Sequence, residues 1–193
     1  MNRKPQSKTH EIVLPEHLLP LASALETCAT PQSVCMALAE FFHVQSSEVA
    51  LLRLEDNALL FLHPEHLRST GAIPVPSSAV AAHTAMSKKA EIFNNFALIK
   101  HASIFEIIRP SDADIADQQA PLPIQKLMSV PIVGHGQSTA LAVIQVSHKG
   151  AEPRFTRDFS REELHDLELV AQLLAAAPFL SHDRSTQHPK LRG

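Results

Sequence analysis

The stretch from Ile124 to Leu174 constrains the fold more than any other part of the chain, because it holds two apolar segments, a glycine turn and a capped helix. The segments Lys126–Val133 and Thr139–Ser147 are rich in strand-forming residues, and a glycine-bearing loop separates them. Such a pattern predicts a β-hairpin. Ser160 stands three residues before Glu163, which is the spacing of a capping box, and apolar residues then recur at helical spacing. The sequence therefore predicts a strand, a tight turn, a second strand and a long helix in succession.

The first half of the chain predicts two helices and a strand pair. Apolar residues at helical spacing predict a helix over Glu16–Cys28, and Thr30 before a proline predicts the start of a second helix. Two β-rich runs then flank Asp56-Asn57, a pair that favours turns. The elements expected from there on are the paired strands Ser47–Glu55 and Ala58–His63, an edge segment at Ile73–Pro76, a short helix that Ser77 or Ser78 caps and that ends near Lys88, a strand at Glu91–Phe96 and a helix at Leu98–Ile108.

This order of helices and strands predicts an α+β fold built around an antiparallel sheet. The chain has 193 residues, a length that suits a single domain. We expect that domain over residues 12–180. The polar segments at 1–11 and 181–193 on either side of it are expected to be disordered.

Composition and charge exclude several classes of protein. Lys and Arg number 17 against 20 Asp and Glu, so no strong positive field attracts nucleic acid or anionic lipid. Trp and Tyr are absent, so base stacking would depend on Phe and His. No apolar run approaches the roughly 20 residues of a membrane span, and the N-terminus lacks the apolar region of a secretory signal. Two cysteines are too few for a disulfide framework and suit a reducing compartment. Together these features predict a soluble cytoplasmic protein without nucleic-acid or membrane partners.

The run Ser129–Ile132, the branched strand through Gln145 and the helix start at Phe155–Ser160 together resemble the end of a GAF domain. The element order over roughly Leu18–Leu180 is similar to the same family. PAS domains share the architecture, but paired N-terminal helices and a final hairpin that leads directly into a long helix favour GAF. The resemblance implies a GAF-like antiparallel sheet of five to six strands, with the N- and C-terminal helices on one face and a helical roof over the other.

The resemblance also implies a function and a place for the ligand. GAF domains sense small molecules or regulate a partner, and the ligand lies between the sheet and the roof. Gln145 and Ser129 are then ligand-binding candidates, because they are polar residues on neighbouring, largely apolar strands. The candidates from the roof segment are His83, Asn94, His101 and Arg109. For each of them a surface position or a satisfied core position is the alternative, and the ligand and any cofactor are not identified.

Two other groups of residues favour a structural interpretation. His63 and His66 flank a carboxylate at a metal-like spacing, but a chance pair is expected among twelve histidines, so a solvated loop and no metal site are predicted. Cys28 and Cys35 lie on different expected helices and are interpreted as buried, inert thiols. Free-methionine sulfoxide reductases are GAF enzymes with reactive cysteines in the pocket, and the pocket region Arg68–Ser147 contains none. The protein is therefore expected not to be an enzyme, with no catalytic residues.

Cyclic-nucleotide GAF domains carry an Asn-Lys pair, a Phe and an Asp-Glu pair. Lys149, Phe155 and Asp158 have the matching types, whereas His148 and Phe159 replace the Asn and the final acid. Because the motif is broken twice, cyclic-nucleotide binding is not predicted. We interpret Phe155 as a core residue and Asp158 as a favourable charge near a helix N-terminus.

The last helix is expected to be apolar on two faces, which is more than one sheet can cover. Its second face, with Leu169, Leu173 and Ala176, would then meet another copy of the chain. Two function classes follow. One is a small-molecule sensor that signals through dimerised end helices to an unidentified output protein. The other is a dimerisation or protein-interaction module that binds no ligand.

Overall fold

The computed structural model describes residues 13–69, 71–96 and 122–180. In this part of the chain one antiparallel sheet has six strands in the order β3-β2-β1-β6-β5-β4. The strands are β1 (Val49–Glu55), β2 (Ala58–His63), β3 (Ala72–Pro74), β4 (Glu91–Phe93), β5 (Ile124–Val133) and β6 (Ala140–Lys149). The expected α+β class is confirmed, and so is the final hairpin.

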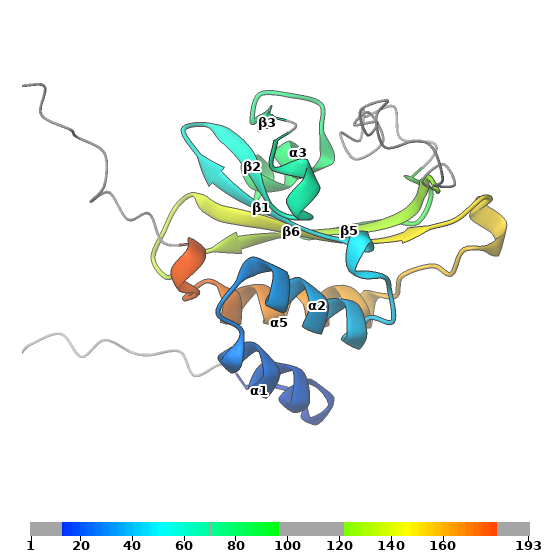
Figure 1. Ribbon diagram of the computed structural model, residues 1–193, viewed down its shortest axis with the longest axis horizontal. Coiled ribbons are helices and arrows are strands. Elements are labelled where there is room, and N and C mark those ends of the chain that lie inside the picture. The colour runs from blue at the N-terminus through cyan, green and yellow to red at the C-terminus, as the bar shows by residue number, and fades with distance from the viewer. Residues whose placement is uncertain (1–12, 70, 97–121, 181–193) are drawn as a thin grey trace, which may run out of the picture.

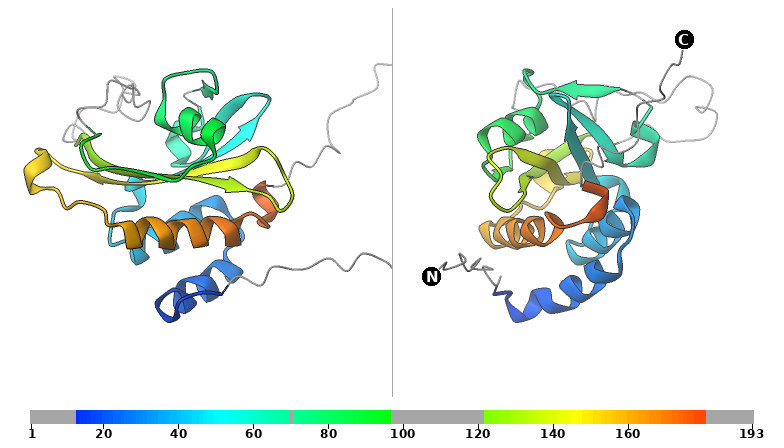
Figure 2. Two further views of the ribbon diagram at one scale, coloured as in Figure 1. Left: turned by 180° about the vertical axis from the view of Figure 1, so that it is seen from behind. Right: turned by 90° about the vertical axis from the view of Figure 1, so that its left-hand side faces the viewer.

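Helices cover both faces of the sheet. On one face α2 (Pro31–Phe41) and α5 (Arg161–Leu174) lie against the strands, and α1 (Leu19–Thr27) lies outside them (Figures 1 and 2). On the opposite face lies α3 (Val80–Ser87) (Figure 1). The short 3-10 turns are η1 (Glu16–Leu18), η2 (Ser46–Glu48), η3 (Glu65–Leu67), η6 (Pro153–Phe155) and η7 (Pro178–Leu180). The N- and C-terminal helices therefore share one face, as the sequence predicted.

Strand alternation divides the core into two layers. On β6, Ile144 and Val146 pack with the helical layer of α2 and α5, while Val143 packs on the face that α3 covers. Leu51 and Leu52 on β1 divide between the same two layers. Both faces of the central strands are buried, which explains why these strands read as nearly continuous apolar runs.

The local turn and cap signals explain where most elements begin and end. Asp56 and Asn57 both have positive φ, at 46° and 66°, as the tight turn between β1 and β2 requires. The Thr30 side chain accepts a hydrogen bond from Ser33 N at 3.1 Å and begins α2. Ser160 and Glu163 form the expected capping box of α5.

Hydrogen bonds explain two of the element boundaries that differ from the expectation, those of α3 and β4. The N-cap of α3 is Ala79 and makes no side-chain cap bond, so the expected capping by Ser77 or Ser78 is wrong. Ser77 Oγ instead accepts a long hydrogen bond, 3.5 Å, from Ala79 N. Strand β4 ends at Phe93, because the next residue, Asn94, leaves the ladder to bind the chain before α5.

The second apolar face of α5 is more covered than expected. Leu169 is only 8% exposed and belongs to the core of the helical layer, whereas Leu173 is half-buried and Ala176 is exposed. Part of the cover is η1, because His17 Nε2 lies 2.9 Å from both carboxylate oxygens of Asp166 on α5. The expectation that Leu169, Leu173 and Ala176 are all left uncovered for contact with a second copy of the chain is therefore wrong for Leu169.

None of the helices that the structure describes is long and apolar enough to span a bilayer. The helix expected at Leu98–Ile108 lies outside the described residues, as do the terminal segments.

Candidate functional site

Ser129 and Gln145 lie opposite each other on β5 and β6, the two strands of the final hairpin. They are register partners in β5 and β6, and Gln145 Nε2 donates a hydrogen bond to Ser129 Oγ at 3.0 Å. Ser129 is 0% exposed and Gln145 is 3% exposed. The structure therefore brings together the two strand residues that the sequence singled out.

Thr84 on α3 is a third member of this group, and sequence reasoning missed it. Its Oγ1 lies 2.7 Å from Ser129 Oγ, and it donates a hydrogen bond to the Val80 carbonyl at 2.9 Å. A threonine hydroxyl has a single proton, so the Ser129 hydroxyl must be the donor to Thr84. Thr84 shares the sheet-facing side of α3 with Ala81 and Ala85, and this helical spacing was the available signal.

The three side chains form a one-way chain of hydrogen bonds in an apolar layer. It runs from the Gln145 amide to the Ser129 hydroxyl, then to Thr84, and ends on the Val80 carbonyl. Apolar residues of the sheet and of α3 surround it, among them Ala50, Leu52, Val143, Ala81 and Ala85. Hydrogen bonds in such surroundings are strong, and losing one partner is costly. Ser129 can donate to a ligand only if its bond to Thr84 breaks.

The roof candidates do not join this chain. His83 is on the outer side of α3, where its side chain is 62% exposed and its Nε2 lies 3.2 Å from Glu91 Oε2. Asn94 binds the backbone of Phe159 with both ends of its amide, each at 2.9 Å, and so fixes the start of α5. His101 and Arg109 lie outside the described residues.

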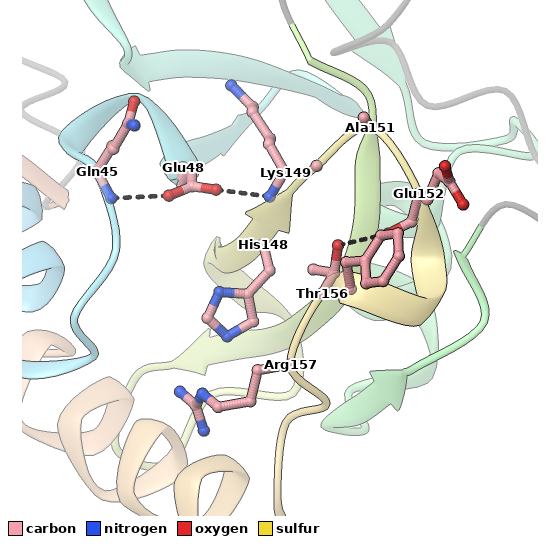
Figure 3. A pocket seen from close by; sticks show the side chains of 10 residues that line it. Gln45, Glu48, His148, Lys149, Ala151, Glu152, Thr156 and Arg157 are labelled. Carbon is pink, nitrogen blue, oxygen red and sulfur yellow. Dashed lines mark hydrogen bonds between the residues drawn. The ribbon is translucent and has the colours of Figure 1, made fainter.

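A second feature is an open depression of about 340 Å³ at the end of β6, which the sequence did not predict (Figure 3). Its lining comes from the loop around η2, the end of β6 and the loop that leads to α5. Glu48 organises one wall, because its Oε2 accepts from Gln45 N at 2.8 Å and its Oε1 accepts from Lys149 N at 2.6 Å. The backbone N–H of Lys149, the last residue of β6, is therefore bonded to the Glu48 carboxylate instead of to a carbonyl of β1.

His148 and Arg157 occupy the wall nearest α5 (Figure 3). The His148 ring stacks on Phe159 with centroids 4.1 Å apart, and its buried Nε2 has no hydrogen-bond partner in the described part of the chain. Burial lowers the pKa of His148, and the Arg157 charge lowers it further, against the carboxylates of Glu48 and Glu163. The imidazole is therefore neutral near neutral pH.

Arg157 donates two hydrogen bonds to Glu163, at 3.1 and 2.8 Å. This bidentate pairing raises the pKa of Arg157. Burial alone would raise the pKa of Glu163, but hydrogen bonds from Arg157 and Ser160 lower it overall. The pair holds the loop before α5 against the first turn of that helix.

The residues that match the cyclic-nucleotide motif have separate partners. Phe155 is 77% exposed, so the core interpretation is wrong, and the Arg154 guanidinium lies 4.6 Å from its ring centroid. Asp158 pairs with Lys126 at 2.6 Å, whereas Lys149 Nζ donates to the Ser47 carbonyl at 2.9 Å.

The environments of the histidine pair and of the two cysteines agree with the expectation for one residue of each pair, His66 and Cys35. His63 ends β2, is 7% exposed, and its Nε2 lies 3.0 Å from the Ser46 carbonyl, so the solvated-loop expectation is wrong there; His66 is exposed. The described residues contain no group of three or more His, Cys, Asp or Glu side chains that could hold a metal ion. Both cysteines are free thiols; burial raises the pKa of Cys35 far above its usual range, and Cys28 is half-buried.

The family model of the GAF domain matches residues 31–177, which is more than half of the chain. The chain belongs to the GAF-domain family. The GAF domain of a Coxiella burnetii phosphoenolpyruvate-protein phosphotransferase (ptsP) is similar, with a TM-score of 0.60 at 10% identity over 83% of this chain and 89% of that chain. The GAF domain from the Acinetobacter phosphoenolpyruvate-protein phosphotransferase has a TM-score of 0.59 at 12% identity over the same shares.

Another GAF-like fold is the type II free methionine-R-sulfoxide reductase of Thermoplasma acidophilum, with a TM-score of 0.50 at 15% identity over 80% of this chain and 92% of that chain. A search of curated protein sequences finds no match. At these identities the solved structures show the GAF fold alone. The chemistry of this GAF domain must therefore come from its own side chains.

Proposed function

We propose that this GAF domain is a small-molecule-sensing regulatory module whose ligand binds between the sheet and α3. The supporting observation is the hydrogen-bond chain from Gln145 through Ser129 to Thr84. It is a polar feature in an otherwise apolar layer, and it joins β5 and β6 to α3. A typical small-molecule site has apolar walls and a few polar groups that point toward the same space.

The direction of the hydrogen bonds suggests how binding would be coupled to structure. A ligand oxygen from a carboxylate, phosphate or carbonyl group would accept the Ser129 proton in place of Thr84. The Thr84 hydroxyl would keep its bond to Val80 and would move with α3. The ligand would thus favour a state in which α3 is displaced, and a ligand changes an equilibrium only by such a difference in affinity between two states.

The signal would leave through the helical layer on the opposite face of the sheet. Leu19 on α1 and Met36 on α2 are 52% and 55% exposed, and Leu173 on α5 is half-buried. We propose that this layer forms a homodimer and contacts an output protein that is not identified. Catalysis is not part of the proposal, because the Ser129 hydroxyl donates to another hydroxyl rather than to a general base.

The second candidate is an interaction module that binds no small molecule. The observation in its favour is that Thr84 and Ser129 are both 0% exposed and satisfy each other. On this account the chain of hydrogen bonds only fixes α3 on the sheet.

A thermal-shift screen of size-fractionated metabolite extract distinguishes the two candidates. The sensor predicts at least one fraction that raises the Tm of the wild type and raises it less in Gln145→Ala. The interaction module predicts no such fraction, or one that acts equally on both proteins. Thr27→Val is a suitable control, because it removes an exposed hydroxyl that donates to the Ala24 carbonyl far from the sheet.

A further inference from the structure

Arg157 lies between the open depression at the end of β6 and the first turn of α5 (Figure 3). On the α5 side its Nη1 and Nη2 donate to the Glu163 carboxylate at 3.1 and 2.8 Å. The guanidinium has no other hydrogen-bond partner among the described residues, and the side chain is 55% exposed. Because this pairing uses only part of the N–H donors of a guanidinium, Arg157 can also donate to a molecule in the depression.

His148 lines the depression next to Arg157 and carries an unsatisfied ring nitrogen. Its Nε2 is buried and has no hydrogen-bond partner in the part of the chain that the structure describes. Such atoms are uncommon in folded proteins, and a bound ion or ligand is one usual explanation. His148 lies three residues after Gln145 on β6, so strand alternation puts its side chain on the opposite face of the sheet from the site under α3. The depression is therefore a separate site, on the side of the helical layer.

Glu48 on the opposite wall limits what the depression can bind. Its two oxygens accept from Gln45 N and Lys149 N at 2.8 and 2.6 Å. A carboxylate has lone pairs beyond these two bonds, so Glu48 can also accept from a ligand hydroxyl or amine, whereas it repels a second anionic group. The volume of about 340 Å³ is within the range of small-ligand sites. The lining therefore suits a small molecule with a single anionic group near Arg157 and a hydrogen-bond donor near Glu48.

We propose that the depression binds a small molecule through one carboxylate or phosphate group, which Arg157 recognises in competition with Glu163. A planar guanidinium matches the oxygens of both groups and forms charge-assisted hydrogen bonds with them. An Arg157 side chain that turns toward the ligand gives up its bonds to Glu163. Glu163 Oε2 also accepts from Ser160 N at 2.8 Å, as part of the capping box that begins α5. Binding in the depression therefore changes the surroundings of the first turn of α5.

Anion titrations of the isotope-labelled full chain test this site by NMR. Potassium phosphate and potassium acetate are added separately at constant ionic strength, with potassium chloride as the reference salt. We expect saturable shifts at the Arg157 side-chain N–H and at the backbone amides of Thr156–Ser160 with at least one of the two oxyanions. The ion that saturates at the lower concentration identifies the preferred group. Shifts that do not saturate with either ion, or that chloride reproduces, would overturn the proposal.

Two variants should move the affinity in opposite directions. Arg157→Gln removes the charge that recognises the anion and should weaken its binding several-fold. Glu163→Gln removes the competing carboxylate, while a glutamine at this position can still complete the capping box. This variant should therefore bind the anion several-fold more tightly than the wild type. An affinity in Glu163→Gln that does not exceed that of the wild type would overturn the proposal.

Arg154→Gln is the matched control for the loss of charge. Arg154 belongs to the same loop but pairs with Glu152 at 2.7 Å and does not line the depression. Its replacement should leave the affinity for the anion nearly unchanged. Equal losses in Arg154→Gln and Arg157→Gln would indicate binding to general surface charge and would also overturn the proposal. Because no residue of the hydrogen-bond chain under α3 takes part, these results are independent of the sensor proposal.

Discussion

Ser129 donates its hydroxyl proton to Thr84 over 2.7 Å, and this bond ties β5 to α3, the helix on the face opposite α2 and α5 (Figure 1). Neither residue is exposed to solvent. The bond therefore contributes to stability in every account of the protein. Only in the sensor account does it also have to break.

Thr84→Val should destabilise the protein by about 1 to 3 kcal/mol, because the isosteric side chain leaves the buried Ser129 proton without an acceptor. Ser129→Ala added to Thr84→Val should cost less than the sum of the two single changes, since the unsatisfied donor is then gone. Urea midpoints of the two single variants and the double variant measure this coupling.

The matched control for that cycle is Thr27→Val, which removes a helical hydroxyl bonded to a carbonyl on the surface. It should change stability by less than about 0.5 kcal/mol. Strict additivity between Thr84→Val and Ser129→Ala would contradict the directed hydrogen bond.

Asn94→Ala should destabilise the protein, because it removes both hydrogen bonds that hold the Phe159 backbone before α5. The free energy of unfolding, measured by denaturant titration, is expected to fall by about 1 to 3 kcal/mol. Hydrogen exchange should accelerate at the first turn of α5 more than at α3. Unchanged protection at the start of α5 would show that Asn94 does not have this positioning role.

His148→Phe should make the protein less sensitive to acid. The pKa of His148 is lowered from its ordinary value of 6.5, so the unfolded chain binds this proton more readily than the folded protein does. The stabilising contribution of the neutral ring is therefore complete above pH 6.5 and is lost as the pH falls below it. Phenylalanine keeps the stacking on Phe159 without the titration. Urea midpoints on either side of pH 6.5 should fall less in the variant, and an equal fall would refute the assignment.

Thiol labelling should be slow at Cys35 and should not affect ligand binding. Cys35 is fully buried, and burial raises the pKa of its thiol, so little thiolate is available. We expect the half-buried Cys28 to react first with a thiol reagent and Cys35 to react only as the protein unfolds. The double variant Cys28→Ser/Cys35→Ala should bind whatever the wild type binds. Rapid labelling of Cys35 in the folded protein would contradict its placement in the core.

The proposed homodimer is tested by light scattering of the wild type and Leu173→Glu at micromolar concentration. Leu173 is a partly exposed leucine near the C-terminal end of α5, and a buried glutamate at an interface would weaken association. The neighbouring Gln172→Glu adds the same charge at an exposed position and should leave the dimer intact. The dimer proposal fails if the wild type is already monomeric.

The sequence predicted the fold well where local signals and periodicity agree. The turn at Asp56-Asn57, the cap at Thr30 and the capping box at Ser160 depend on neighbours within a few residues, and each is confirmed. The pairing of Ser129 with Gln145 also follows from the register of a hairpin with a short loop. Such contacts are encoded within one element or between adjacent strands.

The sequence could not predict contacts that depend on how separate elements pack. Asn94 and Phe159 are 65 residues apart, and a polar residue after a strand gives no sign of its distant partner. Phe155 matches a core residue by type, but its position in a projecting loop leaves it exposed. The depression around Lys149 combines three separate segments, which no local pattern indicates.

Mass spectrometry of the protein purified from cells, under native and denaturing conditions, tests the sensor account most directly. The account predicts a small molecule bound to the native wild type and released on unfolding. Its amount should fall in Ser129→Ala and Gln145→Ala and should be unchanged in Lys149→Arg. A wild type that releases no small molecule, or one whose content is the same in Gln145→Ala, would contradict the account and favour the interaction module.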